Sequence, residues 1–338
     1  MIQERLQRWI MTLPDGPEIE AVNQHVVQLA RELYCEYEPT KGPSPDFWQH
    51  LEMWLDNVTE ADQKVLFRLL RHLFFIGPKE LDNLYRVAYN EHVSRWLIDQ
   101  IGVSLDDPTL DTQLSTALQE TWFCPITDSM RINAFYHLNH ITGSNFRPDW
   151  ASLCELGSTV KIDAYIAKHV IKRLVLLEDF VGSGSQVNNA VVFAATLPSR
   201  LPVLCLPLIL CPNGRTSMTL WEGTHANLTC DAVLNLRSLD FLTPTAEASE
   251  PAVYAQARTV AVTAFNTMQA RGPHAQLYSA FGYQETGGLV VLSTNCPDNT
   301  LPLIHFNVPT WNALFPRASR HVLRVLRAAK PPKYADRY

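Results

Sequence analysis

Apolar residues recur at helical spacing through the first third of the chain. The segment from Val65 to Phe74 is typical, because its apolar positions fall three and four residues apart and share one helix face. Proline follows Ser44 and Gly77, where it suits the first position of a helix. The spacing predicts helices over residues 2–13, 17–37, 45–56, 60–75, 78–99 and 109–120.

Beyond residue 120 the pattern changes to short apolar runs that alternate with amphipathic segments. The apolar runs predict strands at residues 121–126, 174–177, 203–210, 288–294 and 301–306. Helices are predicted at residues 130–139, 186–197 and 250–271, and a loop-rich region at 212–245. Strands that alternate with helices favour a largely parallel sheet. We therefore expect an α/β domain in residues 119–338, with a mostly parallel sheet and flanking helices, preceded by an all-helical module in residues 1–118.

Composition and charge narrow the classes of partner. With 46% hydrophobic residues in a chain of 338, a sizeable core can form. A net charge of −6 does not favour duplex nucleic acid, and the basic residues from 317 to 333 are interpreted as one face of an amphipathic final helix. The seven cysteines lack a CxxC pair, and the longest apolar stretch, residues 201–211, is too short to span a bilayer. We expect a cytoplasmic protein with reduced thiols, no signal peptide and no membrane partner.

One segment, residues 174–186, indicates a chemistry. Four apolar residues form a buried strand, and two carboxylates, Glu178 and Asp179, follow at its carboxyl end. A Gly-Ser-Gly-Ser turn at residues 182–185 then opens a helix. Ligands of open α/β sheets bind at the carboxyl ends of strands, and a turn that opens a helix offers free N–H groups to an anion. The segment predicts a site for a sugar phosphate; the alternative is a strand–turn–helix whose acids only cap the helix.

A second turn with anion-binding character follows the predicted strand at 121–126. Thr127, Asp128 and Ser129 precede a predicted helix, and Arg131 is close by. Backbone donors, two hydroxyls and a guanidinium suit a diphosphate. The alternative is that Asp128 or Ser129 is only the N-cap of the helix.

The segment 174–186 resembles the phosphoribosyl pyrophosphate (PRPP) loop of the type I phosphoribosyltransferases. That loop consists of an apolar run, two acidic residues, two apolar residues, any residue and Thr-Gly-x-Thr. The chain follows this order with Glu178, Asp179, Phe180, Val181, Gly182, Ser183, Gly184, Ser185 and Gln186. The resemblance implies that the acid pair binds the ribose 2′- and 3′-hydroxyls and meets Mg²⁺ indirectly, through Mg-PRPP, while residues 182–186 bind the 5′-phosphate.

The loop departs from that pattern at two positions. Gly182 stands where some purine-salvage members have an aspartate that acts as a base, so the resemblance does not extend to ordinary purine salvage. Gln186 replaces a threonine that donates to the phosphate, and a glutamine amide can still donate.

With its helical front half and the run at 295–317, the chain is similar to phosphoribosyltransferase-like effectors of bacterial conflict and antiphage systems, some encoded beside retron reverse transcriptases. The resemblance implies a pentosyltransferase that uses PRPP and Mg²⁺ and transfers phosphoribose to a nitrogen acceptor in antiviral defence. One alternative is a non-catalytic sensor of PRPP or a nucleotide. Another is an effector subunit that docks on a retron-type ribonucleoprotein through the helical module. If the helical module does not dock on a partner, we expect it to mediate oligomerisation. Asn295, Asp298 and Asn299 would either line the pocket of the nucleophile or form a turn in which they bond their own backbone.

Overall fold

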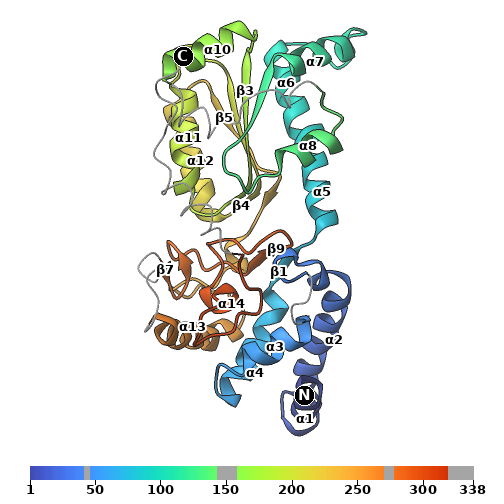
Figure 1. The fold of residues 1–338 in the computed structure, drawn as a ribbon, viewed down its shortest axis with the longest axis vertical. Helices are drawn as coiled ribbons and strands as arrows, with labels where there is room; N and C mark the ends of the chain where they lie inside the picture. The colour runs from blue at the N-terminus through green and yellow to red at the C-terminus, as the bar shows by residue number, and fades with distance from the viewer. Residues whose placement is uncertain (42–45, 143–157, 270–277, 319–338) are drawn as a thin grey trace, which may run out of the picture. The chain divides into compact units, whose positions relative to one another are not determined.

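The computed structural model describes the chain apart from residues 42–45, 143–157, 270–277 and 319–338 (Figure 1). Its contacts group into two compact units. Residues 1–75, 252–283 and 289–338 form the first, here called the helical unit, and residues 76–251 and 284–288 form the second, the sheet unit. The segment 76–118 clusters with the sheet unit, although the sequence places it in the N-terminal module. A boundary at residue 118 between independently folding domains stays a prediction.

Helices make up most of the described part of the helical unit. They are α1 (Ile2–Thr12), α2 (Gly16–Glu32), α3 (Phe47–Leu55), α4 (Glu60–Leu69), α13 (Val253–Gln269) and α14 (Pro302–His305). Single 3₁₀ turns lie at Tyr34–Glu36, Glu38–Thr40 and Leu70–His72. Two small sheets pair β1 (Phe74–Ile76) with β9 (Val290–Leu292) and β7 (Tyr278–Ser279) with β8 (Gly282–Tyr283).

Two sequence predictions in this region are wrong. The helix predicted at 60–75 ends at Leu69, and residues 74–76 form strand β1, so the front of the chain is not entirely helical. The aromatic and β-branched run Phe74-Phe75-Ile76 suits a strand better than a helix. The strand predicted at 301–306 is the short helix α14, which begins at Pro302, a residue suited to the first helical position.

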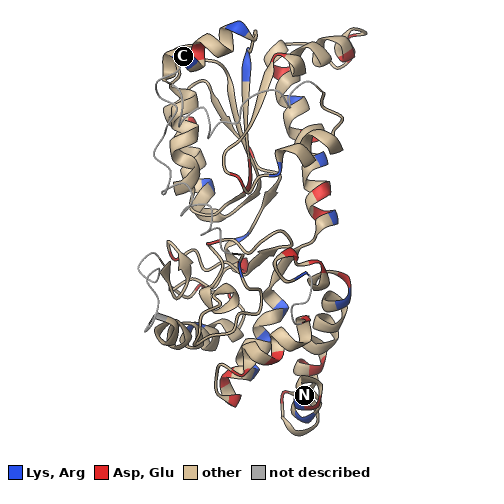
Figure 2. Cartoon of the chain, in the orientation of Figure 1, with Lys and Arg blue, Asp and Glu red and all other residues tan. Residues whose placement is uncertain are grey.

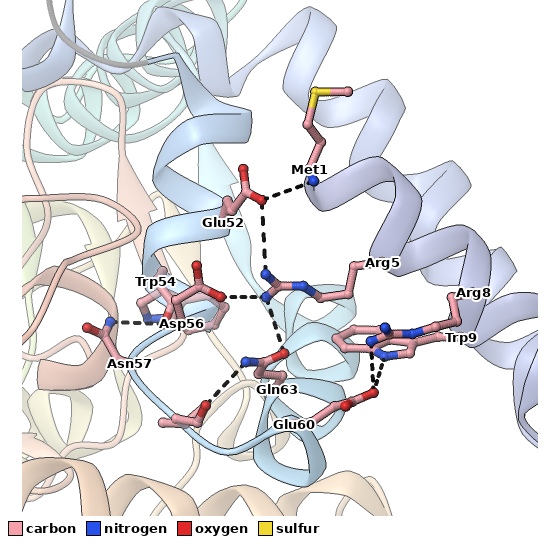
Figure 3. Close-up of polar contacts among 11 residues, drawn as sticks. Met1, Arg5, Arg8, Trp9, Glu52, Trp54, Asp56, Asn57, Glu60 and Gln63 are labelled. Carbon is pink, nitrogen blue, oxygen red and sulfur yellow. Dashed lines mark hydrogen bonds and ion pairs between the residues drawn. The ribbon is translucent and has the colours of Figure 1, made fainter.

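The amphipathic face of α1 explains how the first helix is held. Its Ile2, Leu6 and Trp9 are buried. Polar contacts surround this face: Arg5 Nη1 donates to Asp56 Oδ1 at 2.7 Å, and Trp9 Nε1 donates to Glu60 Oε1 at 3.1 Å (Figure 3). Exposed ion pairs contribute about 1 kcal/mol or less each, so the buried apolar stripe supplies most of the attachment of α1.

The sheet unit contains the parallel sheet that the sequence predicts. Its strands are β2 (Thr121–Pro125), β3 (Arg173–Val181), β4 (Val203–Leu210), β5 (Leu228–Cys230) and β6 (Leu234–Asn235). The order is β2-β3-β4, with β5 and β6 both pairing with the other side of β4, and all of these pairs are parallel. This confirms the α/β fold class. Strand β3 extends to Val181, four residues beyond its predicted end, because Phe180 and Val181 still pair with Ile209 and Leu210 of β4.

Helices cover both faces of this sheet. One face carries α10 (Thr159–Lys168), α11 (Ser185–Ala195) and α12 (Pro212–Thr224) (Figure 1). The other carries α5 (Pro78–Val87), a π-helical turn (Ala88–Val93), α6 (Ser94–Ile101), α7 (Leu110–Gln119) and α8 (Ile132–Leu138). A 3₁₀ turn lies at Ser238–Asp240. Across the part of the chain that the structure describes, no helix combines the length and apolar character needed to cross a membrane.

Helix α12 corrects the prediction that residues 212–245 are loop-rich. Pro212 stands in its first turn, directly after the buried strand β4, and Met218 and Trp221 are buried three residues apart. Asn213, Gly214, Thr216 and Thr219 weaken the apolar periodicity of this helix, and tertiary packing overrides their low helix propensity.

The outer edge of the sheet beside β4 is built from two short strands. Strand β5 ends at Cys230 and β6 begins at Leu234, and between them Val233 N donates to Pro207 O at 3.2 Å. Pro207 lies within β4 and has no N–H to donate.

Candidate functional site

Strand β3 carries Glu178 and Asp179 at the carboxyl end of the sheet. Leu174–Leu177 before them are buried, as expected of a central strand that is covered on both faces. Glu178 is only 3% exposed and Asp179 only 9%. The acid pair also stands out in charge, because β2, β4, β5 and β6 contain no Asp, Glu, Lys or Arg (Figure 2). Two buried carboxylates at this edge need hydrogen-bond donors.

The turn after β2 supplies those donors. Thr127 N donates to Glu178 Oε2 at 2.9 Å, and Thr127 Oγ1 donates to Glu178 Oε1 at 2.5 Å. Ser129 Oγ lies 2.8 Å from Asp179 Oδ1 and 3.3 Å from Glu178 Oε1. The structure therefore brings together two groups of residues that lie about fifty positions apart in the chain and that the sequence marks independently.

The other two predicted residues of this segment lie at its surface. Asp128 and Arg131 are exposed. Arg131 itself occupies the N-cap position of α8, so neither Asp128 nor Ser129 caps that helix, and the alternative interpretation of this turn is wrong. Tyr136 links α8 to strand β2, because its hydroxyl donates to Phe123 O at 3.0 Å.

Burial and charge both act on the acid pair. Burial, followed by the neighbouring Asp179 carboxylate, raises the pKa of Glu178 well above its usual range, and the hydrogen bonds from Thr127 oppose this rise. The Asp179 carboxylate also acts on Tyr85 of α5: burial and then Asp179 raise the pKa of its phenol to about 12, while Arg131 acts in the opposite direction. Within the described ranges, no cluster of three His, Cys, Asp or Glu forms a direct metal site.

Residues 182–184 connect β3 to α11 in a tight loop. Gly184, at the N-cap of α11, has φ of +87°, a left-handed conformation that glycine adopts without a steric penalty. Ser183 Oγ lies 3.1 Å from Ser185 Oγ, and Ser185 and Gln186 are exposed at the start of the helix. The first N–H groups of a helix favour an anion.

The last two residues of β3 and the first residue of the loop are covered by the rest of the sheet unit. Phe180 is half-buried and Val181 and Gly182 are buried. Glu178 and Asp179 lie inside β3, and α11 begins at Ser185 with Gly184 as its N-cap, so the acids do not cap that helix. The alternative interpretation of the segment as an acid-capped helix is therefore wrong.

Helix α12, which sequence reasoning missed, holds the loop from outside. Ser217 Oγ donates to Ser183 O at 2.9 Å, and Trp221 Nε1 donates to Asn188 Oδ1 of α11 at 2.8 Å. A Cβ on Gly184 would lie 2.9 Å from Ser217 Cβ, and a Cβ on Gly214 would lie 2.9 Å from Gly182 O. Two glycines thus let the loop and α12 approach each other closely. The signal that would have found α12 is Pro212 after a buried strand, followed by apolar residues three positions apart.

The run at 295–300 has local contacts in the helical unit. Asn295 Oδ1 accepts from Cys296 N at 3.1 Å, a bond to the backbone of the next residue. Asp298 Oδ1 accepts from Tyr278 OH at 2.6 Å, and Asn299 Nδ2 donates to Tyr283 O at 3.4 Å. Of these three contacts, only that of Asn295 is a bond to its own local backbone, as the turn interpretation expects.

Comparison with known families gives one result. Residues 51–317 match the family model PRTase-CE. The matched range contains the acid pair, the loop at 182–186 and the turn at 127–129. Comparison with curated proteins and with solved structures finds no match.

Proposed function

The chain belongs to the PRTase-CE family, the phosphoribosyltransferases of conflict systems, and from this membership we propose that it binds PRPP with Mg²⁺ and transfers phosphoribose to a nitrogen acceptor. The observation that carries the proposal is the contact between the acid pair of β3 and the hydroxyl turn that follows β2. Both lie at carboxyl ends of neighbouring parallel strands, where ligands of such sheets bind.

In this proposal the acid pair and the loop hold the phosphoribose. Glu178 and Asp179 accept hydrogen bonds from the 2′- and 3′-hydroxyls, which gives these buried carboxylates ligand partners. The N–H groups and hydroxyls of residues 182–186 hold the 5′-phosphate at the start of α11. The loop is already held against α12, so little conformational entropy is lost on binding.

The turn at 127–129 and Arg131 hold the diphosphate. The bond between C1 of the ribose and the diphosphate oxygen breaks while the nucleophile attacks C1 from the opposite side. The two carboxylates stabilise the positive charge that develops on the ring, and the donors of the turn stabilise the negative charge on the leaving group. Magnesium, a cation that prefers oxygen ligands, would supply further neutralisation of the diphosphate. The carboxyl oxygens of the acid pair fit Mg²⁺ as partners that would meet it indirectly, through the bound PRPP.

The test is calorimetry with PRPP and Mg²⁺, followed by an assay of pyrophosphate release in the presence of nitrogen nucleophiles. Asp179→Asn should lower pyrophosphate release by about 100-fold or more, because it removes a charged acceptor from the ribose. Asp106→Asn, an exposed aspartate of the same unit, is the matched control and should release pyrophosphate at the native rate. An unchanged rate in Asp179→Asn would contradict the proposal.

A second candidate is a sensor that binds PRPP or a nucleotide without turnover. Gly182 favours it, since this position brings no carboxylate to act as a base. Binding of PRPP without release of pyrophosphate, with candidate nucleophiles supplied, would support the sensor over the enzyme.

The proposed setting is antiviral defence, with docking on a retron-type ribonucleoprotein as a proposed role of the N-terminal helices. The intact chain should then copurify with a reverse transcriptase–RNA complex encoded beside it. Genes of unrelated metabolism around its coding sequence would count against this setting.

A further inference from the structure

Thr127 and Ser129 place two hydroxyls side by side on the acid pair. Their oxygens are 2.7 Å apart. Thr127 Oγ1 lies 2.5 Å from Glu178 Oε1, and Ser129 Oγ lies 2.8 Å from Asp179 Oδ1. Thr127 therefore meets Glu178, while Ser129 meets Asp179 and, at 3.3 Å, also Glu178 Oε1. The two hydroxyls also contact each other.

This arrangement is the one that a vicinal diol would make. Two adjacent hydroxyl oxygens of a ribose have a similar spacing, and each can donate to one of two neighbouring carboxylates. A diol and the hydroxyls of the turn therefore compete for Glu178 Oε1 and Asp179 Oδ1.

We infer that Thr127 and Ser129 act as a built-in surrogate for the ribose diol, which the ligand displaces when it binds. The inference rests on the proposed function. It adds that the hydroxyls of the turn compete with the ribose for the acid pair. Once displaced, the two hydroxyls can donate to the diphosphate. Binding of the ribose would then make these donors available at the neighbouring diphosphate site.

The local structure suits such an exchange. The two hydroxyl bonds that the turn gives up are replaced by two from the diol, so the carboxylates stay paired. Thr127 and Ser129 are half-buried and Asp128 is exposed, so these three residues carry little buried apolar surface, while Ile126 and Met130 on either side are buried. Phe135 and Tyr136 of α8, which follow the turn, are buried and provide a fixed support.

The experiment compares ribose 5-phosphate with 2-deoxyribose 5-phosphate by calorimetry. The double variant Thr127→Val, Ser129→Ala removes both hydroxyls and keeps the backbone donor of residue 127. It should bind ribose 5-phosphate about tenfold more tightly than the native chain, because no competitor has to be displaced. Its gain for 2-deoxyribose 5-phosphate should be smaller, since that ligand has no vicinal diol to offer.

The matched control is Thr116→Val, Ser199→Ala, which makes the same chemical changes at exposed positions of the same unit. It should bind both ligands as the native chain does. Ser129→Ala alone keeps both Thr127 bonds to Glu178 and should give about a threefold gain for ribose 5-phosphate, which supplies a second readout if the double variant unfolds.

The outcomes separate the inference from the proposed function. If the native chain binds ribose 5-phosphate and neither variant binds it more tightly, the surrogate role is overturned while the proposed function stands. If the native chain binds neither ribose 5-phosphate nor PRPP with Mg²⁺, the proposed function is overturned, and the surrogate role with it.

Discussion

The two connections that leave the carboxyl ends of β2 and β3 are held in different ways. The hydroxyls of the turn at 127–129 contact the acid pair, and in our proposal a ligand replaces them there. The loop at 182–184 is held by a neighbouring helix, through Ser217 and through close backbone approaches at two glycines. We therefore propose that the first connection is exchangeable, whereas the second is held in one shape by packing.

In the proposed function, this contrast would let a single site combine a rigid part with a part that responds to the ligand. A phosphate is bound best by N–H groups that are already in position, which the packing of α12 provides. The negative charge on a leaving group grows during the reaction. In our proposal, the hydroxyls that stabilise this charge leave the acid pair only when the ligand binds. The predictions below alter one connection at a time.

The largest effect is expected for Gly184→Ala. Alanine is strained at φ of +87°, and its Cβ would lie 2.9 Å from Ser217 Cβ. Together these should lower the free energy of unfolding by about 3 kcal/mol and weaken ribose 5-phosphate binding. Urea unfolding and calorimetry measure the two effects.

The matched control for Gly184→Ala is Gly223→Ala in helix α12. A Cβ there meets nothing within 4 Å, so alanine should stabilise the helix by up to about 0.8 kcal/mol and leave binding unchanged. Equal behaviour of the two alanine variants would show that the loop is not fixed by α12.

Gly214→Ala changes the other side of the same contact. The Cβ would lie 2.9 Å from Gly182 O and 2.8 Å from Leu210 Cδ1, without a strained backbone. We expect a loss of about 2 kcal/mol in the free energy of unfolding, less than for Gly184→Ala, because only the overlap remains. A reversed order of the two losses, measured by urea unfolding, would contradict the role assigned to the left-handed backbone.

The pH dependence of stability reports on the turn and the acid pair. Because the pKa of folded Glu178 is raised, its protonated form contributes stability that is fully present below the unfolded pKa, near pH ~4.3, and is lost as the pH rises through the folded pKa. Over that rise, the native free energy of unfolding should fall relative to that of Glu178→Gln. Urea unfolding over a pH series measures this.

The exposed Glu80→Gln in the same unit is the matched control for this pH series and should follow the native profile. Parallel profiles for the native chain and Glu178→Gln would show that burial does not control this carboxyl.

The smallest effect is expected for Ser217→Ala. It removes the hydrogen bond to Ser183 O but keeps the shape of the contact, and water can reach the half-buried carbonyl. The free energy of unfolding should fall by about 1 kcal/mol or less. A larger loss than for Gly214→Ala, again by urea unfolding, would mean that the hydrogen bond rather than the close packing holds the loop.

Much of the sheet could be predicted from the sequence, because apolar runs bounded by turns carry a local signal. Strand β4 has the predicted bounds, and the resemblance of residues 174–186 is confirmed at the level of the family. The extension of β3 to Val181 depends on pairing with Ile209 and Leu210, which no local pattern encodes. Tyr85 could not be placed beside Asp179 for the same reason, since its helix precedes the sheet by many residues.

The candidate site was predictable as two separate segments. The acid pair and the turn at 127–129 each carry a local signal, but the hydrogen bonds between them arise from the register of β2 with β3. Helix α12 was hidden by residues of low helix propensity, so the support of the loop was missed. The roles of these residues toward a ligand stay predictions.

Pro207 has a consequence for how the chain behaves among its own copies. The outer edge of the sheet consists of strands of three and two residues, interrupted beside a proline. Such an edge offers no long row of unpaired N–H and C=O groups, so an incoming strand has little to pair with. Strand β4, buried at all eight positions, is the kind of apolar segment that aggregates when exposed. The short, interrupted strands beside β4 thus work against edge-to-edge pairing on that side of the sheet.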